Sequence, residues 1–289
     1  MMTRSPRLAV IGRAGSGVDN IDVEAATELG VVVVNAPTGN AAAVAEHTLG
    51  LMLSVARKIP RAHGSMGRGE WAKSALQGAS LAGKTLGIVG MGAIGKEVAK
   101  LAAAFGMHVL AAPRRRTGAE GPLCASSSSS SPMSVTGVGE AQSLEELLAR
   151  SDYVSVHVPL TAETAGLLGP DELALMKETA VVINTARGGV VEEQALLKCL
   201  QSGSLGGAAL DVFCREALPL DGHVAELCNL DSVVCTPHIG ASTREAGDLV
   251  LQEVCASVAA ALAGTLPAAA MVSGDPDTGR LQRARMRLE

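Results

Sequence analysis

The stretch that decides the fold is KTLGIVGMGAIGKEVAKLAAAFGMHVL, residues 84–110. An apolar run leads into Gly90, Gly92 and Gly95, which have the spacing G-x-G-x-x-G, and an alanine-rich segment and a second apolar run follow. Glycines at these positions permit a tight turn, let the backbone approach a pyrophosphate and let the helix pack close to the strand. The N-terminus of that helix would face the phosphates. The stretch therefore predicts a dinucleotide-binding βαβ unit.

The same alternation of apolar runs and helical patterns extends along the whole chain, which favours parallel strands joined by crossover helices. Most of the runs are continuously apolar, as expected of strands that helices bury on both faces. The predicted class is α/β, with a Rossmann-like doubly wound parallel sheet. The predicted strands are Leu8–Ile11, Val31–Asn35, Thr85–Val89, Met107–Ala111, Tyr153–Val158, Ala180–Asn184, Gly207–Phe213 and Ser232–Cys235.

Helices are predicted over residues 143–151, 171–177, 192–203 and 242–264, the last opening with a capping box from Ser242 to Glu245. Residues 118–140 contain many serines and glycines and little periodic apolar content, so they are interpreted as a flexible surface insertion. The run of six serines in it fits either a phosphorylation platform or a solvated loop without function.

Composition narrows the possible functions. The chain has 289 residues, 47% apolar residues and a net charge of -5, which indicates a globular protein and offers no basic surface for nucleic acid. No apolar run reaches the roughly 18 residues of a membrane span. The six cysteines lack the spacing of a zinc site and are interpreted as reduced core thiols, so no metal is predicted: Cys124, Cys199, Cys214, Cys228, Cys235 and Cys255.

Three chemically capable residues each follow a predicted strand: Arg187, Glu216 and His238. In an open α/β sheet the ligand crevice lies at the carboxyl ends of the strands, so all three are expected at that edge. An arginine can hold a carboxylate with two parallel hydrogen bonds. Histidine can transfer a proton near neutral pH, and a neighbouring carboxylate can orient its ring. Each residue taken alone could equally be a surface or loop side chain.

The chain resembles the D-isomer-specific 2-hydroxyacid dehydrogenase family nearly from end to end. The matching segments include GRAGSGVDNID, NAPTGN, AEHTLGLMLSVARKIP, GKTLGIVGMGAIGKEVA, VHVPLTAETAGLLG, INTARGGVVEE, GAALDVF and TPHIGAST, in the family's order. The resemblance implies a second, smaller flavodoxin-like substrate domain, of which only a remnant is present because two βα units of the family are missing before residue 8. The expected boundaries are residues 37–242 for the dinucleotide-binding domain and 1–36 with 243–289 for the incomplete substrate domain.

The resemblance also implies the roles of individual residues. Arg187 would bind the substrate carboxylate, His238 would transfer the proton and Glu216 would be its partner. Gly15 and Gly17 would contact the substrate through backbone N–H groups. The expected cofactor contacts are Ser16, Gly90, Gly92, Ala93, Ile94, Gly95, Val158, Thr185, Ala186, Asp211, His238, Gly240 and Ala241.

The activity implied is hydride transfer between NAD and a small anionic D-2-hydroxy acid, with oxidation of 3-phosphoglycerate to 3-phosphohydroxypyruvate in L-serine biosynthesis as the preferred reaction. Glyoxylate or hydroxypyruvate reduction with NADPH is the alternative. A non-catalytic NAD-binding scaffold and an inactive truncated fragment remain open. A cytoplasmic protein is expected, although an upstream extension could carry an organellar targeting segment. The segment between Glu216 and His238 is a few residues longer than usual, which leaves their approach to each other open.

The end of the second strand of the glycine unit departs from the family. NAD-preferring relatives have an aspartate there for the ribose hydroxyls, whereas this chain has Ala112 and Pro113. Arg114 and Arg115 follow, and an arginine at this place can pair with the 2′-phosphate of NADP. The cofactor is thus expected to be NAD, with NADP as the alternative that Arg114 suggests. A solvated basic loop explains the arginines equally well.

The apolar segment AAAVAEHTLGLMLSVARKI, residues 41–59, needs burial on more than one face. A homodimer interface and a helix buried within one chain both satisfy this requirement.

Overall fold

The computed structural model describes residues 2–113, 137–267, 270–273 and 279–286. The chain divides into two compact units. As far as their residues are described, one unit comprises 1–41 and 241–289, and the other 42–115 and 134–240. Arg114, Arg115, Cys124 and most of the predicted insertion lie outside the described residues.

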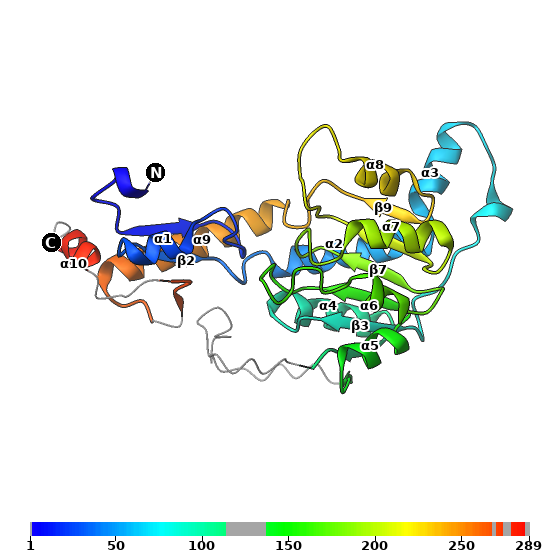
Figure 1. The fold of residues 1–289 in the computed structure, drawn as a ribbon, viewed down its shortest axis with the longest axis horizontal. Helices are drawn as coiled ribbons and strands as arrows, with labels where there is room; N and C mark the ends of the chain where they lie inside the picture. Colours follow the sequence, from blue (N-terminus) through cyan, green and yellow to red (C-terminus); the bar gives the residue numbers. More distant parts are fainter. Residues whose placement is uncertain (1, 114–136, 268–269, 274–278, 287–289) are drawn as a thin grey trace. The chain divides into compact units, whose positions relative to one another are not determined.

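The larger unit is built on a seven-stranded sheet in which every paired strand is parallel (Figure 1). Its spatial order is β5-β4-β3-β6-β7-β8-β9. The sheet thus runs outward in both directions from β3 and β6, which is the doubly wound order. The Rossmann-like prediction is confirmed. The strands are β3 (Thr85–Val89), β4 (His108–Ala111), β5 (Val138–Glu140), β6 (Tyr153–Val156), β7 (Val181–Asn184), β8 (Gly207–Leu210) and β9 (Val233–Cys235).

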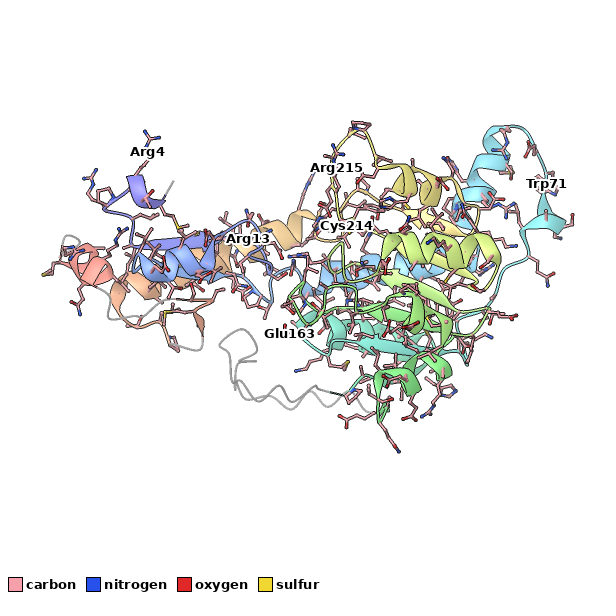
Figure 2. The ribbon with its side chains drawn as sticks, viewed as in Figure 1. Arg4, Arg13, Trp71, Glu163, Cys214 and Arg215 are labelled. Atoms are coloured by element: carbon pink, nitrogen blue, oxygen red, sulfur yellow. The ribbon has the colours of Figure 1, made fainter. Side chains whose placement is uncertain are left out.

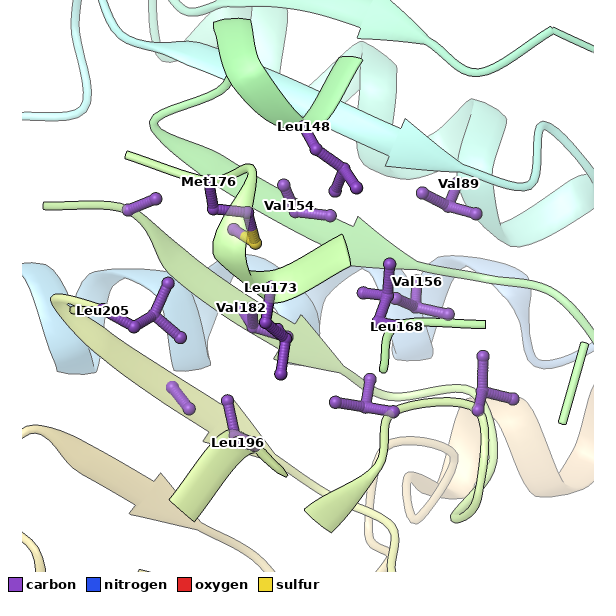
Figure 3. Packing of buried hydrophobic residues seen from close by; sticks show 14 of the residues in the cluster. Val89, Leu148, Val154, Val156, Leu168, Leu173, Met176, Val182, Leu196 and Leu205 are labelled. Atoms are coloured by element: carbon purple, nitrogen blue, oxygen red, sulfur yellow. The ribbon is translucent and has the colours of Figure 1, made fainter. Parts of the chain in front are cut away.

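Helices cover both faces of this sheet. On one face, α2 (Ala41–Ala56) and α4 (Ala93–Ala104) pack against strand residues such as Leu86 and Ile183. On the other face, a larger cluster joins Leu148, Leu173 and Leu196 to Val154 and Val182 (Figure 3). It includes residues of α5 (Leu144–Arg150), α6 (Pro170–Ala174), α7 (Glu193–Ser202) and α8 (Gly222–Asn229). Burial of both faces explains the continuously apolar strands.

The apolar face of α2 is buried within the chain: Ala45, Leu49 and Met52 belong to the core cluster of the larger unit. Beyond α2, the chain forms α3 (Ile59–Gly67) and the 3-10 helix η2 (Lys73–Leu76). This segment exposes large apolar side chains, and Trp71, which is 81% exposed, points away from the ribbon (Figure 2).

The smaller unit contains the two-stranded parallel sheet of β1 (Val10–Arg13) and β2 (Val32–Asn35), so the expected second, smaller parallel unit is present. Its helices are η1 (Met2–Arg4), α1 (Val23–Glu28), α9 (Arg244–Ala263) and α10 (Gly279–Arg285). Val250 and Val254 of α9 share a core cluster with Val32 and Val34. An isolated antiparallel bridge between Val33 and Ser273 pairs part of β2 on its outer side.

Helix α9 is long and apolar enough to cross a membrane by length and composition alone. The buried helix of a water-soluble protein passes the same test. Helix α9 begins with Arg244 and Glu245 and packs one face on β1 and β2, where Val250 and Val254 are buried, so it is interpreted as a helix that covers the small sheet.

Three sequence predictions need correction. The predicted insertion 118–140 ends in a strand, β5, whose three residues pair with β4. The strand was not predicted because three residues are too few to show a periodic apolar pattern in the sequence. The cap of α9 is Thr243, whose hydroxyl accepts the Ala246 N–H, rather than Ser242. The core-thiol interpretation is wrong for three cysteines, which are exposed: Cys214, Cys228 and Cys255. The other two described cysteines, Cys199 and Cys235, are half-buried.

Candidate active site

The glycine turn between β3 and α4 has the geometry that a dinucleotide needs. Gly90 has a φ of +105°, and a Cβ there would lie 2.6 Å from the carbonyl oxygen of His157. A Cβ at Gly95 would lie too close to the carbonyl oxygen of Gly90, so the helix passes against the turn. At Gly92, the N-cap of α4, a Cβ would meet nothing within 4 Å. Ala93 and Ile94 begin the helix. The free space at Gly92 and the N-terminus of α4 fit the pyrophosphate of NAD.

The backbone after β9 is held by a buried carboxylate. Asp211, at the end of β8 and 1% exposed, accepts hydrogen bonds from the N–H groups of Ile239 at 2.9 Å and Gly240 at 2.8 Å. It also accepts one from the Thr236 hydroxyl at 2.5 Å, and Nε2 of His47 lies 3.3 Å away. Burial alone would raise the pKa of Asp211, but these hydrogen bonds outweigh it and the pKa lies below its usual value.

His238 lies in the backbone segment that Asp211 holds. Its N–H donates to the carbonyl of Asp211 at 2.8 Å, and its φ of +53° places it in the left-handed region. Such a backbone is uncommon for a residue with a side chain and persists only where neighbouring contacts fix it. The imidazole is 46% exposed, so it is accessible to a ligand.

Glu216 and His238 form a pair. Nδ1 of His238 lies 2.8 Å from Oε2 and 3.0 Å from Oε1 of Glu216. A carboxylate beside Nδ1 accepts a hydrogen bond from the Nδ1–H group, which leaves Nε2 as the ring nitrogen that can accept a proton from a ligand. The longer segment between the two residues therefore does not keep them apart.

Arg187 follows β7 on a loop with fixed backbone. The side chain of Asn184 donates to the Arg187 carbonyl at 2.9 Å and accepts the Ala186 N–H at 3.1 Å. The guanidinium is half-buried and donates to the Ala186 carbonyl at 2.6 Å. Arg187, Glu216 and His238 thus follow β7, β8 and β9, three neighbouring strands, at their carboxyl ends.

The other predicted cofactor residues have the following positions. Thr185 and Ala186 are buried after β7, with the Thr185 hydroxyl 2.9 Å from that of Thr48. Val158 is half-buried after β6. In the smaller unit, the Ser16 carbonyl accepts from the Asn35 side chain at 2.6 Å and the buried Gly15 has a φ of +140°. Gly17 and Ala241 also belong to the smaller unit.

Sequence reasoning missed several polar residues that support the site. His47 belongs to α2 and contacts Asp211 and Thr236. Glu193, at the start of α7, contacts the segment that contains Glu216. His157 follows β6, and its Nε2 lies 2.8 Å from the Ser155 hydroxyl. Each of them lies far in sequence from its partners or within an apolar pattern, so no local motif marks it.

A doubly wound sheet with this glycine turn, and with an arginine, a glutamate and a histidine at its carboxyl edge, defines the class of dinucleotide-dependent oxidoreductases. Residues 49–240 match the family described as D-isomer specific 2-hydroxyacid dehydrogenase, NAD binding domain. The chain belongs to this family.

Individual relatives agree with the family match. The chain is 45% identical over 258 residues to the D-3-phosphoglycerate dehydrogenase of Methanocaldococcus jannaschii, which covers 88% of this chain and 46% of that protein. A D-lactate dehydrogenase from Aquifex aeolicus, solved with NAD and lactic acid, superposes with a TM-score of 0.78 at 30% identity and covers 91% of this chain and 79% of that one. An NADPH-dependent glyoxylate/hydroxypyruvate reductase from Sinorhizobium meliloti, solved with NADP and malonate, gives 0.74 at 29% identity, covering 88% and 75%.

The chain spans about half the length of the curated relatives it matches.

Proposed function

We propose that this protein oxidises a small anionic D-2-hydroxy acid with NAD, and that its substrate is 3-phosphoglycerate, which becomes 3-phosphohydroxypyruvate in L-serine biosynthesis. The observation that carries the proposal is the pairing of His238, which follows β9, with Glu216, which follows β8; β8 is the neighbour of β7, the strand that leads into the Arg187 loop. Relatives named D-3-phosphoglycerate dehydrogenase support the substrate. Bound NAD supplies the hydride acceptor for the substrate carbon.

In the proposed reaction Arg187 binds the substrate carboxylate with its guanidinium, which fixes the hydroxyl-bearing carbon in place. Nε2 of His238 accepts the hydroxyl proton as the hydride leaves the adjacent carbon, so the C–H and O–H bonds break and the carbonyl forms. Glu216 holds Nδ1 and stabilises the imidazolium that results. In the reverse direction His238 returns the proton.

The proposed cofactor contacts in the larger unit are the turn Gly90, Gly92 and Gly95, the first helical residues Ala93 and Ile94, and Val158, Thr185 and Ala186. Asp211, His238 and Gly240 complete the set. Residues 37–242 are proposed as the dinucleotide-binding domain, with Ala241 as a further cofactor contact near its end. Residues 1–36 with 243–289 are proposed as the part that contains the substrate contacts of Gly15 and Gly17 and the nicotinamide contact of Ser16.

A second candidate is reduction of glyoxylate or hydroxypyruvate with NADPH. One observation favours it: Ala112 and Pro113 follow β4, where a carboxylate would bind the ribose hydroxyls of NAD. The similarity to the reductase solved with NADP supports the same alternative.

We further propose that two copies of the chain associate and that the protein acts in the cytoplasm. The exposed side chains of Ile59, Met66 and Trp71 on the segment after α2 support an interface between copies. Sedimentation of the purified chain, compared with that of a Trp71→Ser variant, tests this association: a monomer in both samples contradicts it.

The test of the activity is an assay of nicotinamide reduction with 3-phosphoglycerate, glycerate and lactate, each with NAD and with NADP. A parallel assay follows the oxidation of NADH and of NADPH with glyoxylate and with hydroxypyruvate. A kcat/KM at least tenfold higher for 3-phosphoglycerate with NAD supports the first proposal. Preference for glyoxylate or hydroxypyruvate with NADPH supports the second.

A further inference from the structure

The segment between β8 and α8 contains Glu216 and is largely exposed; Figure 2 labels Cys214 and Arg215 on it. Its internal ion pair joins Arg215 to Asp221 at 3.0 Å, with both side chains at least one-third exposed, and exposed pairs stabilise little. The precise distance between Glu216 and His238 therefore needs an attachment elsewhere in the molecule.

Glu193 provides this attachment from the first turn of α7. Its side chain is 7% exposed. Oε1 accepts the backbone N–H of Cys214 at 2.6 Å, and Oε2 lies 2.9 Å from Nε2 of His223. The two oxygens of one buried carboxylate thus hold residues 214 and 223, on either side of Glu216.

The backbone beside this attachment is tightly packed. A Cβ at Gly188 would lie too close to the carbonyl group of Phe213, so the loop after Arg187 lies directly against the start of the segment. The N–H of Phe213 is also 3.4 Å from Oε1 of Glu216. A shift of Cys214 would therefore move Glu216 as well.

We infer that Glu193 is a positioning residue, which holds the 214–223 segment so that the Glu216 carboxylate meets Nδ1 of His238. Glu193 does not touch that imidazole; it acts through Glu216. A buried carboxylate with both oxygens engaged is suited to this, because charge-assisted hydrogen bonds are shorter and stronger than neutral ones.

Cys214 offers an independent report on the attachment. Partial burial of its sulfur, and next the charge of Glu193, raise the pKa of the Cys214 thiol to about 11. Loss of that charge should shift the pH profile of Cys214 alkylation, read at its own peptide by mass spectrometry, to lower pH. A Glu193→Gln variant should show this shift, and Glu192→Gln, the same change at the exposed neighbouring residue, should not.

The decisive experiment reads His238 directly and needs no turnover. The full chain is labelled with ¹⁵N at the histidine rings, and the His238 signals are identified by their loss in His238→Asn. In the parent they should have the positions of the Nδ1–H form, which Glu216 selects. In Glu193→Ala they should move toward the mixture of tautomers of a free imidazole. Glu193→Gln, which keeps an oxygen for the Cys214 N–H, should restore most of the parent spectrum.

Glu192→Ala is the matched control and should leave the His238 signals in place. If Glu193→Ala does not fold, His223→Ala releases one end of the segment and should move the signals in the same direction by less. The inference is overturned if a folded Glu193→Ala variant gives the same His238 signals as the parent. If His223→Ala has to replace that variant, the same result there overturns it.

The inference rests on the proposed function for its effect on rate. Glu193→Ala should lower kcat by roughly tenfold or more, since small displacements of catalytic groups are costly, while KM for the hydroxy acid stays within about twofold. A moved His238 signal with unchanged kcat overturns the positioning role in catalysis. Absence of turnover in the parent contradicts the proposed function, and the ring spectra then still decide whether Glu193 positions Glu216.

Discussion

The carboxylate of Asp211 lies 2.8 Å from the backbone nitrogen of Gly240 and accepts its hydrogen bond, although the two residues are 29 positions apart. The contact ties the end of β8 to the segment after β9. Since the N–H of Ile239 and the hydroxyl of Thr236 bind the same side chain, Asp211 fixes the backbone on both sides of His238.

We expect Asp211→Ala to lower the free energy of unfolding by about 3 kcal/mol, because buried N–H groups lose their partner. It should also reduce kcat by about tenfold or more through displacement of His238. Urea unfolding and steady-state kinetics measure the two effects. Full stability together with full activity in this variant contradicts the role assigned to Asp211.

The lowered pKa of Asp211 makes its contribution to the free energy of unfolding depend on pH. A carboxyl whose pKa is lower in the folded state stabilises the fold above its unfolded pKa, and this contribution is lost as pH falls through the folded value. Asp211→Asn should therefore flatten the acid limb of the unfolding free energy. An acid limb identical to that of the parent would show that other carboxyls cause it.

His238→Asn should lower kcat by about a hundredfold or more, because the group that accepts the hydroxyl proton is lost. Dinucleotide binding should remain, since the glycine turn is untouched. Fluorescence titration with reduced nicotinamide dinucleotide measures the binding, and an assay of nicotinamide reduction measures kcat. A variant with the parent's kcat removes His238 from the proposed mechanism.

The same substitution at two glycines of one turn should affect different properties, stability at Gly95 and dinucleotide binding at Gly92. Gly95→Ala places a methyl group against the carbonyl oxygen of Gly90, so the free energy of unfolding should fall by about 1–3 kcal/mol. Gly92→Ala meets no atom within 4 Å and should keep the parent's Tm, yet weaken dinucleotide binding roughly tenfold or more by occupying the place of the pyrophosphate. Equal dinucleotide affinity in Gly92→Ala and the parent contradicts this assignment.

Burial lowers the pKa of His157 to about 4 from its usual 6.5. Its Nδ1 has no hydrogen-bond partner within the described part of the chain. A histidine with a depressed folded pKa stabilises the fold fully above its unfolded pKa, and this contribution is lost as pH falls from about 6.5 toward about 4, by up to about 3 kcal/mol. Urea unfolding across this range should show the loss, and His157→Gln should reduce its slope. An equal slope in both proteins assigns the acid sensitivity to other groups.

Coenzyme preference should depend on the residues that follow β4. Pro113→Asp restores a carboxylate near the expected ribose position and should raise the ratio of kcat/KM for NAD to that for NADP by about tenfold. Pro113→Ser is the matched control without charge. If the parent already prefers NAD strongly and Pro113→Asp leaves the ratio unchanged, residue 113 does not select the coenzyme.

The features of the fold that depend on local sequence patterns could be predicted from the sequence alone. All eight predicted strands are present, because continuous apolar runs and glycine turns reflect the burial and backbone geometry of each strand by itself. The position of Arg187, Glu216 and His238 at one edge followed from the parallel topology. Strand β5 was missed because three residues of an edge strand have almost no apolar periodicity.

Contacts between distant residues could not be predicted in this way. Glu193 has the pattern of an exposed acidic residue in the first turn of a helix, which is common, and only the fold shows that its side chain is buried against Cys214 and His223. His47 likewise lies in an apolar helix without a motif of its own. The exposure of Cys214 follows from its place on a surface segment, which composition does not reveal.

The strand order has a consequence for how such a protein can change. The glycine turn and the end of β4 belong to one half of the sheet, whereas Arg187, Glu216 and His238 follow β7, β8 and β9 in the other half. Substitutions after β4 should thus alter coenzyme choice without disturbing the proposed acid–base chemistry. Selection can act on the two properties separately, and a lineage could exchange one nicotinamide coenzyme for the other while retaining its reaction.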